Sequence, residues 1–416
     1  MKNFYRKKYI DTILSKIETE KLFLLVWARQ VGKTTIMEML KEQLENKYNC
    51  LYFNFEDFFE KQFKTKQEFI DFFKFEFWFD FYSEWILFLD EIQYLNNPES
   101  VLKSIYDDKN IKIKIIATWS RFWWQKKVGS SLIWRWEIIK IYPFDFFEFL
   151  EFRWKDVEIF ENIENFNESK YDLIEKLIEE YQTFWWYPAV VKAISRQDKI
   201  NETKKIIDRF FEKDFIYFMK TGDLLDFKKV FQFIALNTKN IIKVDAIAQN
   251  FSISRYKINQ FLDFLFDSYL IYPCYPYFKD KSKEYNQNYE IYFNDIGMLN
   301  YISGNTNIWN INESLVYLEI LKNNPLKNIY YYKKNNWSEI DFIVENIDKK
   351  IIWIEIKSAD KDIIPKIFES FYTDYKADLE NFVVSTKSLY KQREISDCKV
   401  YFVPNVLIWK YLAKIW

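Results

Sequence analysis

Histidine is absent from the 416-residue chain, and cysteine is scarce. Without histidine there can be no Ser-His-Asp triad, no H-E-x-x-H zinc site and no Cys-His nucleophile. The three cysteines, Cys50, Cys274 and Cys398, form no C-x-x-C pair, which argues against a disulfide framework or a thiolate zinc site. Any chemistry must therefore use carboxylates, lysine, arginine, hydroxyls and hard metals such as Mg²⁺.

A charge excess and a long apolar run are also lacking. Lys+Arg 60 against Asp+Glu 61 give a net charge of −1, so no overall field draws the chain to nucleic acid, although a local basic patch stays open. Apolar runs such as Trp85–Leu89 are too short to cross a bilayer, and the residues after Met1 have no signal-peptide pattern. We expect a cytoplasmic protein that does not associate with membranes.

Glycine is the third deficit, with 5 residues against 16 tryptophans. A chain of this length would carry roughly 29 glycines at the usual ~7%, and many of the tryptophans stand where a turn would favour glycine. These are Trp27, Trp119, Trp134, Trp136, Trp337 and the doublets Trp123–Trp124 and Trp185–Trp186. We infer that most tryptophans are UGA codons for glycine translated as tryptophan, since some bacterial lineages assign UGA to glycine. The alternative is a truly tryptophan-rich protein with aromatic stacking surfaces.

The length and the patterning predict an α/β chain with three regions. Residues 1–150 alternate short apolar runs with helical stretches, which is typical of βαβ units around a parallel sheet. The strands predicted in this region are Leu22–Val26, Leu51–Asn54, Ile86–Asp90, Lys112–Thr118 and Glu137–Ile141.

Residues 151–284 show apolar residues at helical spacing. Two of these helices are joined by Ser252–Ser254, which resembles a winged helix-turn-helix. Such a unit binds DNA in some proteins and is a lid or a protein contact in ATPases, and its basic residues, Arg255 and Lys257, are too few to decide.

Residues 285–416 mix strands and helices again and predict a compact α/β domain. Helices are expected near 312–322 and 362–376. The predicted strands are Ile329–Tyr332, Ile340–Val344, Ile351–Ile356, Asn381–Val384 and Lys399–Val403.

A nearly complete phosphate-binding loop follows the first strand. It matches G-x-x-x-x-G-K-[ST] except at its first position, and its residues are Trp27, Ala28, Arg29, Gln30, Val31, Gly32, Lys33 and Thr34, with Thr35 next in the following helix. In such a loop, backbone N–H groups and a helix N-terminus surround the phosphates. Lys33 is expected to neutralise them and the Thr34 hydroxyl to bind Mg²⁺, whereas an indole at Trp27 would obstruct the turn.

Later strand ends carry further candidates for an ATP site. One buried strand ends in Asp90 and Glu91, which predicts a carboxylate that positions Mg²⁺ and one that polarises the attacking water; a solvated strand end is the alternative. Thr118 and Ser120 are candidate sensors of the γ-phosphate, against an ordinary turn. Arg135 is either an arginine finger that acts on a second subunit or a surface arginine.

With tryptophan read as glycine, four segments become "GARQVGKTT", "GILFLDEIQYL", "ATGSR" and "LIGRGEIIKIYPFDFFEFL". The chain then resembles the AAA-type ATPase family of bacteria and archaea that joins this domain to a C-terminal domain of unknown function with a nuclease-like fold. The segments "TFWWYPAVV", "NDIGMLNY" and "SEIDFIVE" match as well, so the resemblance covers nearly the whole chain. It implies a P-loop domain with an AAA- or RecA-like sheet and a restriction-endonuclease-like C-terminal domain.

The C-terminal region carries an acid on one predicted strand and E-x-K on the next. Asp341 lies fourteen residues before Glu355, and Lys357 follows two residues later. Since residues i and i+2 of a strand share a face, Glu355 and Lys357 would face a metal that Asp341 also binds, with Lys357 orienting or deprotonating a metal-bound water. Glu313, at the start of a helix, is the candidate extra acid. The alternative is an acid–lysine pair on a solvated sheet face.

The sequence thus predicts an ATPase that uses Mg²⁺ and couples hydrolysis to its middle and C-terminal regions. Two alternatives stay open: an ATP-gated, metal-dependent nuclease that acts on DNA, and a nucleotide-controlled binding module without useful turnover. ATP is the expected ligand. DNA, a protein partner and an oligomer are left open.

Overall fold

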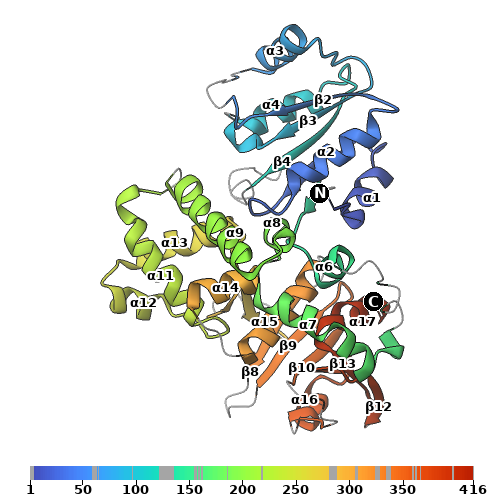
Figure 1. Cartoon of the computed structure of the whole chain (residues 1–416), viewed down its shortest axis with the longest axis vertical. Coiled ribbons are helices and arrows are strands. Elements are labelled where there is room, and N and C mark those ends of the chain that lie inside the picture. Colours follow the sequence, from blue (N-terminus) through green and yellow to red (C-terminus); the bar gives the residue numbers. More distant parts are fainter. Residues whose placement is uncertain are drawn as a thin grey trace. The chain divides into compact units, whose positions relative to one another are not determined.

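The computed structural model of the chain is shown in Figure 1. It describes residues 4–58, 63, 65–95, 97–120, 135–153, 157, 160, 163–184, 186–216, 219–280, 288–304, 308–323, 328–333, 339–357, 360, 363–365, 367–395 and 398–415. The chain divides into two compact units, which are Met1–Pro143 with Leu265–Tyr269, and Phe144–Phe264 with Leu270–Trp416. The predicted middle and C-terminal regions share the second unit. Their division at residue 284 stays a prediction.

A parallel five-stranded sheet forms the centre of the first unit, with the strand order β2-β3-β4-β1-β5. Its strands are β1 (Leu22–Val26), β2 (Asn49–Asn54), β3 (Trp85–Asp90), β4 (Lys114–Trp119) and β5 (Trp136–Lys140). All five lie where the sequence predicts them, with ends shifted by at most two residues. The order places β4 between β1, which leads into the phosphate-binding loop, and β3, which ends in Asp90.

Helices cover both faces of this sheet (blue to cyan in Figure 1). They are α1 (Lys7–Ser15), α2 (Lys33–Leu44), α3 (Lys66–Phe77) and α4 (Pro98–Tyr106), with a 3₁₀ turn η1 (Ile92–Tyr94) after β3. The helix α2 packs over β2, β3 and β4, whereas residues of α3 and α4 share a core with Leu22 and Leu24 of β1. Since successive side chains of a strand point to opposite faces, the equally buried Phe23 and Leu25 fill the other side. The predicted α/β class is confirmed.

The second unit contains a mixed eight-stranded sheet in the order β12-β13-β11-β10-β9-β8-β6-β7. Its strands are β6 (Ile271–Pro276), β7 (Glu290–Phe293), β8 (Asn328–Lys333), β9 (Glu339–Glu345), β10 (Ile351–Ile356), β11 (Leu379–Thr386), β12 (Lys391–Ile395) and β13 (Cys398–Pro404). The five strands that the sequence predicts here are all present. β6, β7 and β12 were not predicted; β12 is charged and mostly exposed, and it forms only by antiparallel pairing with β13 at the sheet edge.

Helices of the second unit lie before and around this sheet. They are α6 (Phe146–Arg153), α7 (Glu168–Thr183), α8 (Pro188–Lys192), α9 (Arg196–Arg209), α11 (Leu224–Leu236), α12 (Val244–Phe251), α13 (Arg255–Asp267), α14 (Ile296–Ser303), α15 (Ile308–Asn323), α16 (Ile367–Tyr375) and α17 (Ile408–Ile415). Short turns are η4 (Ile163–Asn165), the π-helical η5 (Phe210–Phe215), η6 (Thr221–Asp223) and η8 (Asn405–Leu407). The helices α11, α12 and α13 precede the antiparallel pair β6–β7, and the winged helix stays a prediction. No helix in the described ranges is both long and apolar enough to cross a membrane.

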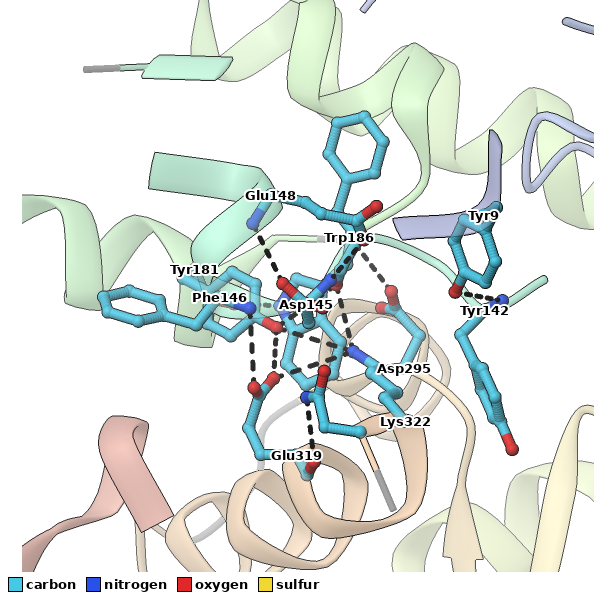
Figure 2. A network of polar contacts seen from close by, with 12 residues as sticks. Tyr9, Tyr142, Asp145, Phe146, Glu148, Tyr181, Trp186, Asp295, Glu319 and Lys322 are labelled. Atoms are coloured by element: carbon cyan, nitrogen blue, oxygen red, sulfur yellow. Dashed lines mark hydrogen bonds and ion pairs between the residues drawn. The ribbon is translucent and has the colours of Figure 1, made fainter. Parts of the chain in front are cut away.

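A buried polar cluster joins α15 to the start of the second unit (Figure 2). Lys322 Nζ lies 3.4 Å from the ring centroid of Trp186 and donates to the Phe144 carbonyl at 3.0 Å. Glu319 accepts hydrogen bonds from the Tyr181 hydroxyl at 2.5 Å and the Phe146 N–H at 3.5 Å. These contacts join segments more than 130 positions apart in sequence, so residues from Phe144 onward pack with the C-terminal domain rather than extending the first unit.

Candidate functional site

The phosphate-binding loop lies between the carboxyl end of β1 and the start of α2. Its backbone enters the left-handed region at Trp27 (φ 154°), Gln30 (φ 65°) and Gly32 (φ 98°), where a residue without a Cβ atom is least strained. The Trp27 indole is buried, with its ring 4.0 Å from the ring of Tyr142 and 4.3 Å from that of Tyr269. The first loop position therefore has a conformation typical of glycine, as the motif requires.

Lys33 and Thr34 begin α2 directly after this loop. Lys33 is buried, and its Nζ donates to the carbonyls of Trp27 and Ala28 at 2.9 Å each. The amine thus lies against the loop whose backbone would hold the phosphates. Thr34 Oγ1 donates to Asp90 Oδ2 at 2.7 Å, which brings together the two side chains that the sequence assigns to the metal.

Two other loop residues contact residues outside the loop, and these contacts hold the loop in place. The Arg29 guanidinium donates to the Tyr94 hydroxyl at 2.6 Å and lies 3.7 Å from Glu56. Val31 is buried, and its carbonyl accepts a hydrogen bond from Arg6 at 2.9 Å. Thr35 continues the first turn of α2 and is half-buried.

Asp90 is the centre of the hydrogen-bond network at the carboxyl ends of β3 and β4. It is 2% exposed and accepts from Thr34, from the Tyr52 hydroxyl at 2.7 Å, from Thr118 Oγ1 and from the Glu91 N–H at 3.1 Å. Burial and the contact with Asp90 raise the pKa of Tyr52, which keeps it a hydrogen-bond donor. Four donors fix this carboxylate in one orientation.

Glu91 is held by a second set of contacts. Its backbone is left-handed (φ 53°), and its N–H donates to Thr118 Oγ1 at 2.9 Å. Ser120 Oγ donates to both carboxylate oxygens of Glu91, at 2.8 and 2.9 Å, and the Gln93 amide donates to Oε2. The two candidate sensors thus donate to different carboxylates, Thr118 to that of Asp90 and Ser120 to that of Glu91.

Arg135 lies apart from this set. It directly precedes β5, at the amino end of the strands, whereas the loop follows their carboxyl ends. Its guanidinium binds Asp107 through two hydrogen bonds of 2.8 and 3.1 Å. The structure does not bring Arg135 to the loop of its own chain, and action on a second subunit stays a prediction. Trp134, beside it in the sequence, and Arg121, which follows Ser120, lie outside the described residues.

A second group of predicted residues meets in the C-terminal domain. Asp341 on β9 accepts the Ile356 N–H at 2.7 Å, and Lys357 Nζ donates to Glu355 Oε1 at 2.7 Å at the end of β10. Burial and the charge of Asp341 raise the pKa of Glu355 to about 7 and that of Glu313, on α15, to about 8. Burial also raises the pKa of Asp341. Glu313, Asp341, Glu355 and Lys357 therefore form one electrostatic cluster.

Sequence reasoning missed four residues at these two sites. Tyr52 and Gln93 contact Asp90 and Glu91, while Lys239 and Glu290 join the C-terminal cluster, where Lys239 donates to Glu313. Tyr52 could have been found from the pairing of β2 with β3, which places it two residues from the partner of Asp90. No sequence signal indicates that Lys239, more than seventy positions before Glu313, reaches it.

Residues 19–150 match the family model described as an AAA domain. Residues 175–308 and 310–405 match those of two domains of unknown function, DUF8612 and DUF4143. These matches agree with the resemblance that the sequence motifs indicate.

Two relatives are both described as uncharacterized. One, from Haemophilus influenzae, is 24% identical over 97% of this chain and 98% of its own length. Another, from Methanocaldococcus jannaschii, is 26% identical over 65% of this chain and 59% of its own. Among solved structures, a Walker-type ATPase of Pyrococcus abyssi is similar with a TM-score of 0.47 and 14% identity, over 72% of this chain and 96% of that one.

Proposed function

Because the chain joins an AAA domain at residues 19–150 to the domain of unknown function DUF4143 at residues 310–405, we propose that it binds ATP and hydrolyses it. The observation that carries this proposal is the convergence on Asp90. A P-loop hydroxyl from Thr34, a β4 hydroxyl from Thr118 and the Glu91 N–H all donate to this one carboxylate. These are the residue types that P-loop ATPases use around the metal and the attacking water.

The residues present fit Mg²⁺, which prefers oxygen ligands. Thr34 Oγ1 and Asp90 Oδ2 are 2.7 Å apart and would hold the ion, directly or through water. When bound, Mg²⁺ neutralises charge on the phosphates. Lys33 would leave the carbonyls of Trp27 and Ala28 to bind the phosphates, and its ammonium would then compensate the charge that builds up on them.

Glu91 is the group we assign to the attacking water. Ser120 and Gln93 fix its carboxylate beside Asp90, so it can accept a proton or polarise water without reorienting. Hydrolysis would then change the contacts of Thr118 and Ser120.

The test is ATP turnover by full-length protein carrying Glu91→Gln. We expect a loss of about 100-fold or more in kcat with ATP binding retained, because the amide keeps the shape but cannot act as a base. The matched control is Glu84→Gln, an exposed glutamate before β3, which should hydrolyse ATP at the normal rate. Normal turnover by the Glu91 variant would refute the assignment.

The second candidate function is a metal-dependent nuclease in the C-terminal domain. It is favoured by the cluster of Asp341, Glu355, Lys357 and Glu313. Burial raises the pKa of all three carboxyl groups, and the charge of Asp341 adds to the rise at Glu355 and Glu313. Glu355 Oε2 and Glu313 Oε2 are buried and have no hydrogen-bond partner among the described residues, so both could accept a divalent cation. Within the same residues, no three acidic side chains are yet close enough to hold one ion.

Lys357→Ala separates this function from the first. If the domain is an ATP-gated nuclease acting on DNA, this variant loses cleavage and keeps ATP hydrolysis, while Glu91→Gln loses both. Lys333→Ala, on the exposed part of β8, is the control. If the native protein neither hydrolyses ATP nor cuts DNA, the nucleotide-controlled binding module remains, with a protein as its partner.

Direct DNA binding by the winged-helix-like helices has less support. Lys257 pairs with Asp223 and Asp226, and Arg255 pairs with Asp245. Both cations would have to leave these acids to reach a phosphate backbone. We therefore propose that α11–α13 transmit the nucleotide state to the C-terminal domain.

A further inference from the structure

The turn between α11 and α12 is fixed against β7. Thr238 Oγ1 and the Lys239 N–H both donate to the Ile291 carbonyl, at 3.0 and 3.1 Å, and the Ile242 N–H donates to the Tyr289 carbonyl at 3.2 Å. Lys239 has a left-handed backbone (φ 69°), which costs a residue with a Cβ atom on the order of 1–3 kcal/mol. These hydrogen bonds on both sides hold that conformation and direct the lysine.

The side chain of Lys239 reaches the carboxylate cluster of the C-terminal domain. Its ammonium forms an ion pair with Glu313 Oε1, and the side chains are 27% and 6% exposed. Glu313 Oε2 is buried without a hydrogen-bond partner among the described residues. Asp341 and Glu290 are near enough to act electrostatically on Glu313. Lys239 is thus a cation set among acids.

Lys239 and Glu313 come from different parts of the chain. Lys239 belongs to the segment that matches DUF8612, whereas Glu313, Asp341 and Glu355 belong to the segment that matches DUF4143. Lys357 already pairs with Glu355 within the C-terminal domain. A nearly buried carboxylate needs a positive partner, and for Glu313 the middle region supplies one.

We propose that Lys239 is a built-in cation that competes with a divalent metal ion for Glu313, so that the α11–α12 turn controls metal binding in the C-terminal domain. The proposal rests on the proposed metal-dependent site. While the turn is hydrogen-bonded to β7, the ammonium takes one oxygen of Glu313. When α11 and α12 move, the ammonium is withdrawn and the carboxylate becomes available to a divalent cation.

The experiment measures Mn²⁺ binding directly, from the loss of the free-ion electron paramagnetic resonance signal. All proteins are full-length and carry Asp90→Asn, which removes a ligand from the ATP site. Lys239→Met keeps the length of the side chain and removes its charge. Lys243→Met, an exposed lysine at the N-cap of α12, is the matched control, and Glu313→Gln removes the carboxylate itself.

We expect Lys239→Met to bind Mn²⁺ about tenfold more tightly than the parent, because the metal no longer competes with the charged hydrogen bond from Lys239 to Glu313. Lys243→Met should match the parent, and Glu313→Gln should lose the gain when combined with Lys239→Met. Unchanged or weaker binding by Lys239→Met overturns the role of Lys239 while leaving the metal site standing. No Mn²⁺ binding by any of these proteins overturns the metal site and the proposal with it.

Folding is checked for each variant by its thermal transition. If Lys239→Met does not fold, Lys239→Gln serves in its place, because the amide can still donate to Glu313 but carries no charge. Tighter Mn²⁺ binding by this second variant supports the proposal, and parent-like binding contradicts it.

Discussion

Trp27 and Trp78 are the two tryptophans in the described part of the chain whose φ angle is positive, at 154° and 56°. Trp27 opens the phosphate-binding loop, and Trp78 is the C-cap residue directly after α3, with its side chain 86% exposed. A left-handed residue after a helix is usually glycine, and so is the first residue of a P-loop. Both positions fit the hypothesis that UGA codons for glycine were translated as tryptophan.

Mass spectrometry of the native protein tests that hypothesis. Peptides that contain residues 27 and 78 should have the mass of glycine at each position. An intact indole at both would contradict it, and the strain at Trp27 would then be a true property of the loop.

Trp27→Gly also has a functional consequence. In protein made with tryptophan at every such codon, this substitution should tighten ATP binding about tenfold, since left-handed strain of ~1–3 kcal/mol is relieved in the loop that must close on the phosphates. Trp78→Gly is the matched control, with the same backbone preference at a helix end outside the site. Binding of fluorescent ATP measures both, and equal affinities for the two variants would be the contrary result.

Ser120 acts at the same scale, through Glu91. Because Ser120 Oγ contacts both carboxylate oxygens of Glu91, Ser120→Ala should lower kcat by about tenfold and change KM little. Ser104→Ala, which loses only a bond to a carbonyl within α4, should leave both constants unchanged. Steady-state ATP hydrolysis measures the difference. A change confined to KM would place Ser120 in nucleotide binding instead.

At the scale of elements, α15 is joined to α6 and α7 by buried ionisable groups. Burial raises the pKa of Glu319 to about 7, with the charge of Asp145 adding to the rise, while Lys322, the Tyr181 hydroxyl and the Phe146 N–H lower it. Burial raises the pKa of the neighbouring Asp295 to about 6. Both shifts favour the protonated acid in the folded protein.

The sign of the pH dependence follows from proton uptake. Between pH 4.5 and 7 the folded chain binds more protons at Glu319 than the unfolded chain does, so stability falls as pH rises through this window. Glu319→Gln should reduce this fall by on the order of 1–3 kcal/mol, and Glu179→Gln, exposed on α7, should not. Urea unfolding at pH 5 and pH 8 measures it. If the free energy of unfolding decreases by the same amount in the Glu319 variant as in the parent, this carboxyl does not titrate between pH 5 and pH 8.

At the scale of the whole molecule, the two units have separate cores. One is built around β1, β3 and β4, and the other around Trp353, Phe371 and Phe382. Nucleotide contacts are expected in the first alone. Ligand binding to one of two folding units stabilises that unit by mass action.

Calorimetry should therefore show two thermal transitions. ATP with Mg²⁺ at 100 times its Kd should stabilise one by about 2.7 kcal/mol and leave the other nearly unchanged. Lys33→Ala should abolish the shift, whereas Lys41→Ala, a half-buried lysine near the end of α2 that pairs with Glu45, should keep it. One transition that shifts as a whole would mean that the units unfold together.

The sequence by itself determined the first sheet and which side chains stand at the ends of its strands. Short apolar runs separated by helical stretches are typical of a parallel sheet, which is why all five strands were predicted. Lys33, Thr34, Asp90 and Glu91 were predicted as site residues because phosphate and metal binding requires such side chains at fixed offsets from strand ends, and their roles stay a prediction. The C-terminal strands that carry Asp341 and Glu355 were predicted from their apolar runs.

Only the tertiary structure decided how distant segments meet. The buried contacts of Glu319 and Lys322 join residues from Phe144 onward to the second unit, while the domain boundary at residue 150 stays a prediction. Tyr52 and Lys239 were missed because their roles depend on strand pairing and on a turn that packs against β7. Local periodicity reports which face of an element is apolar. It cannot report which distant polar group pairs with a buried charge, because tertiary packing determines that partner.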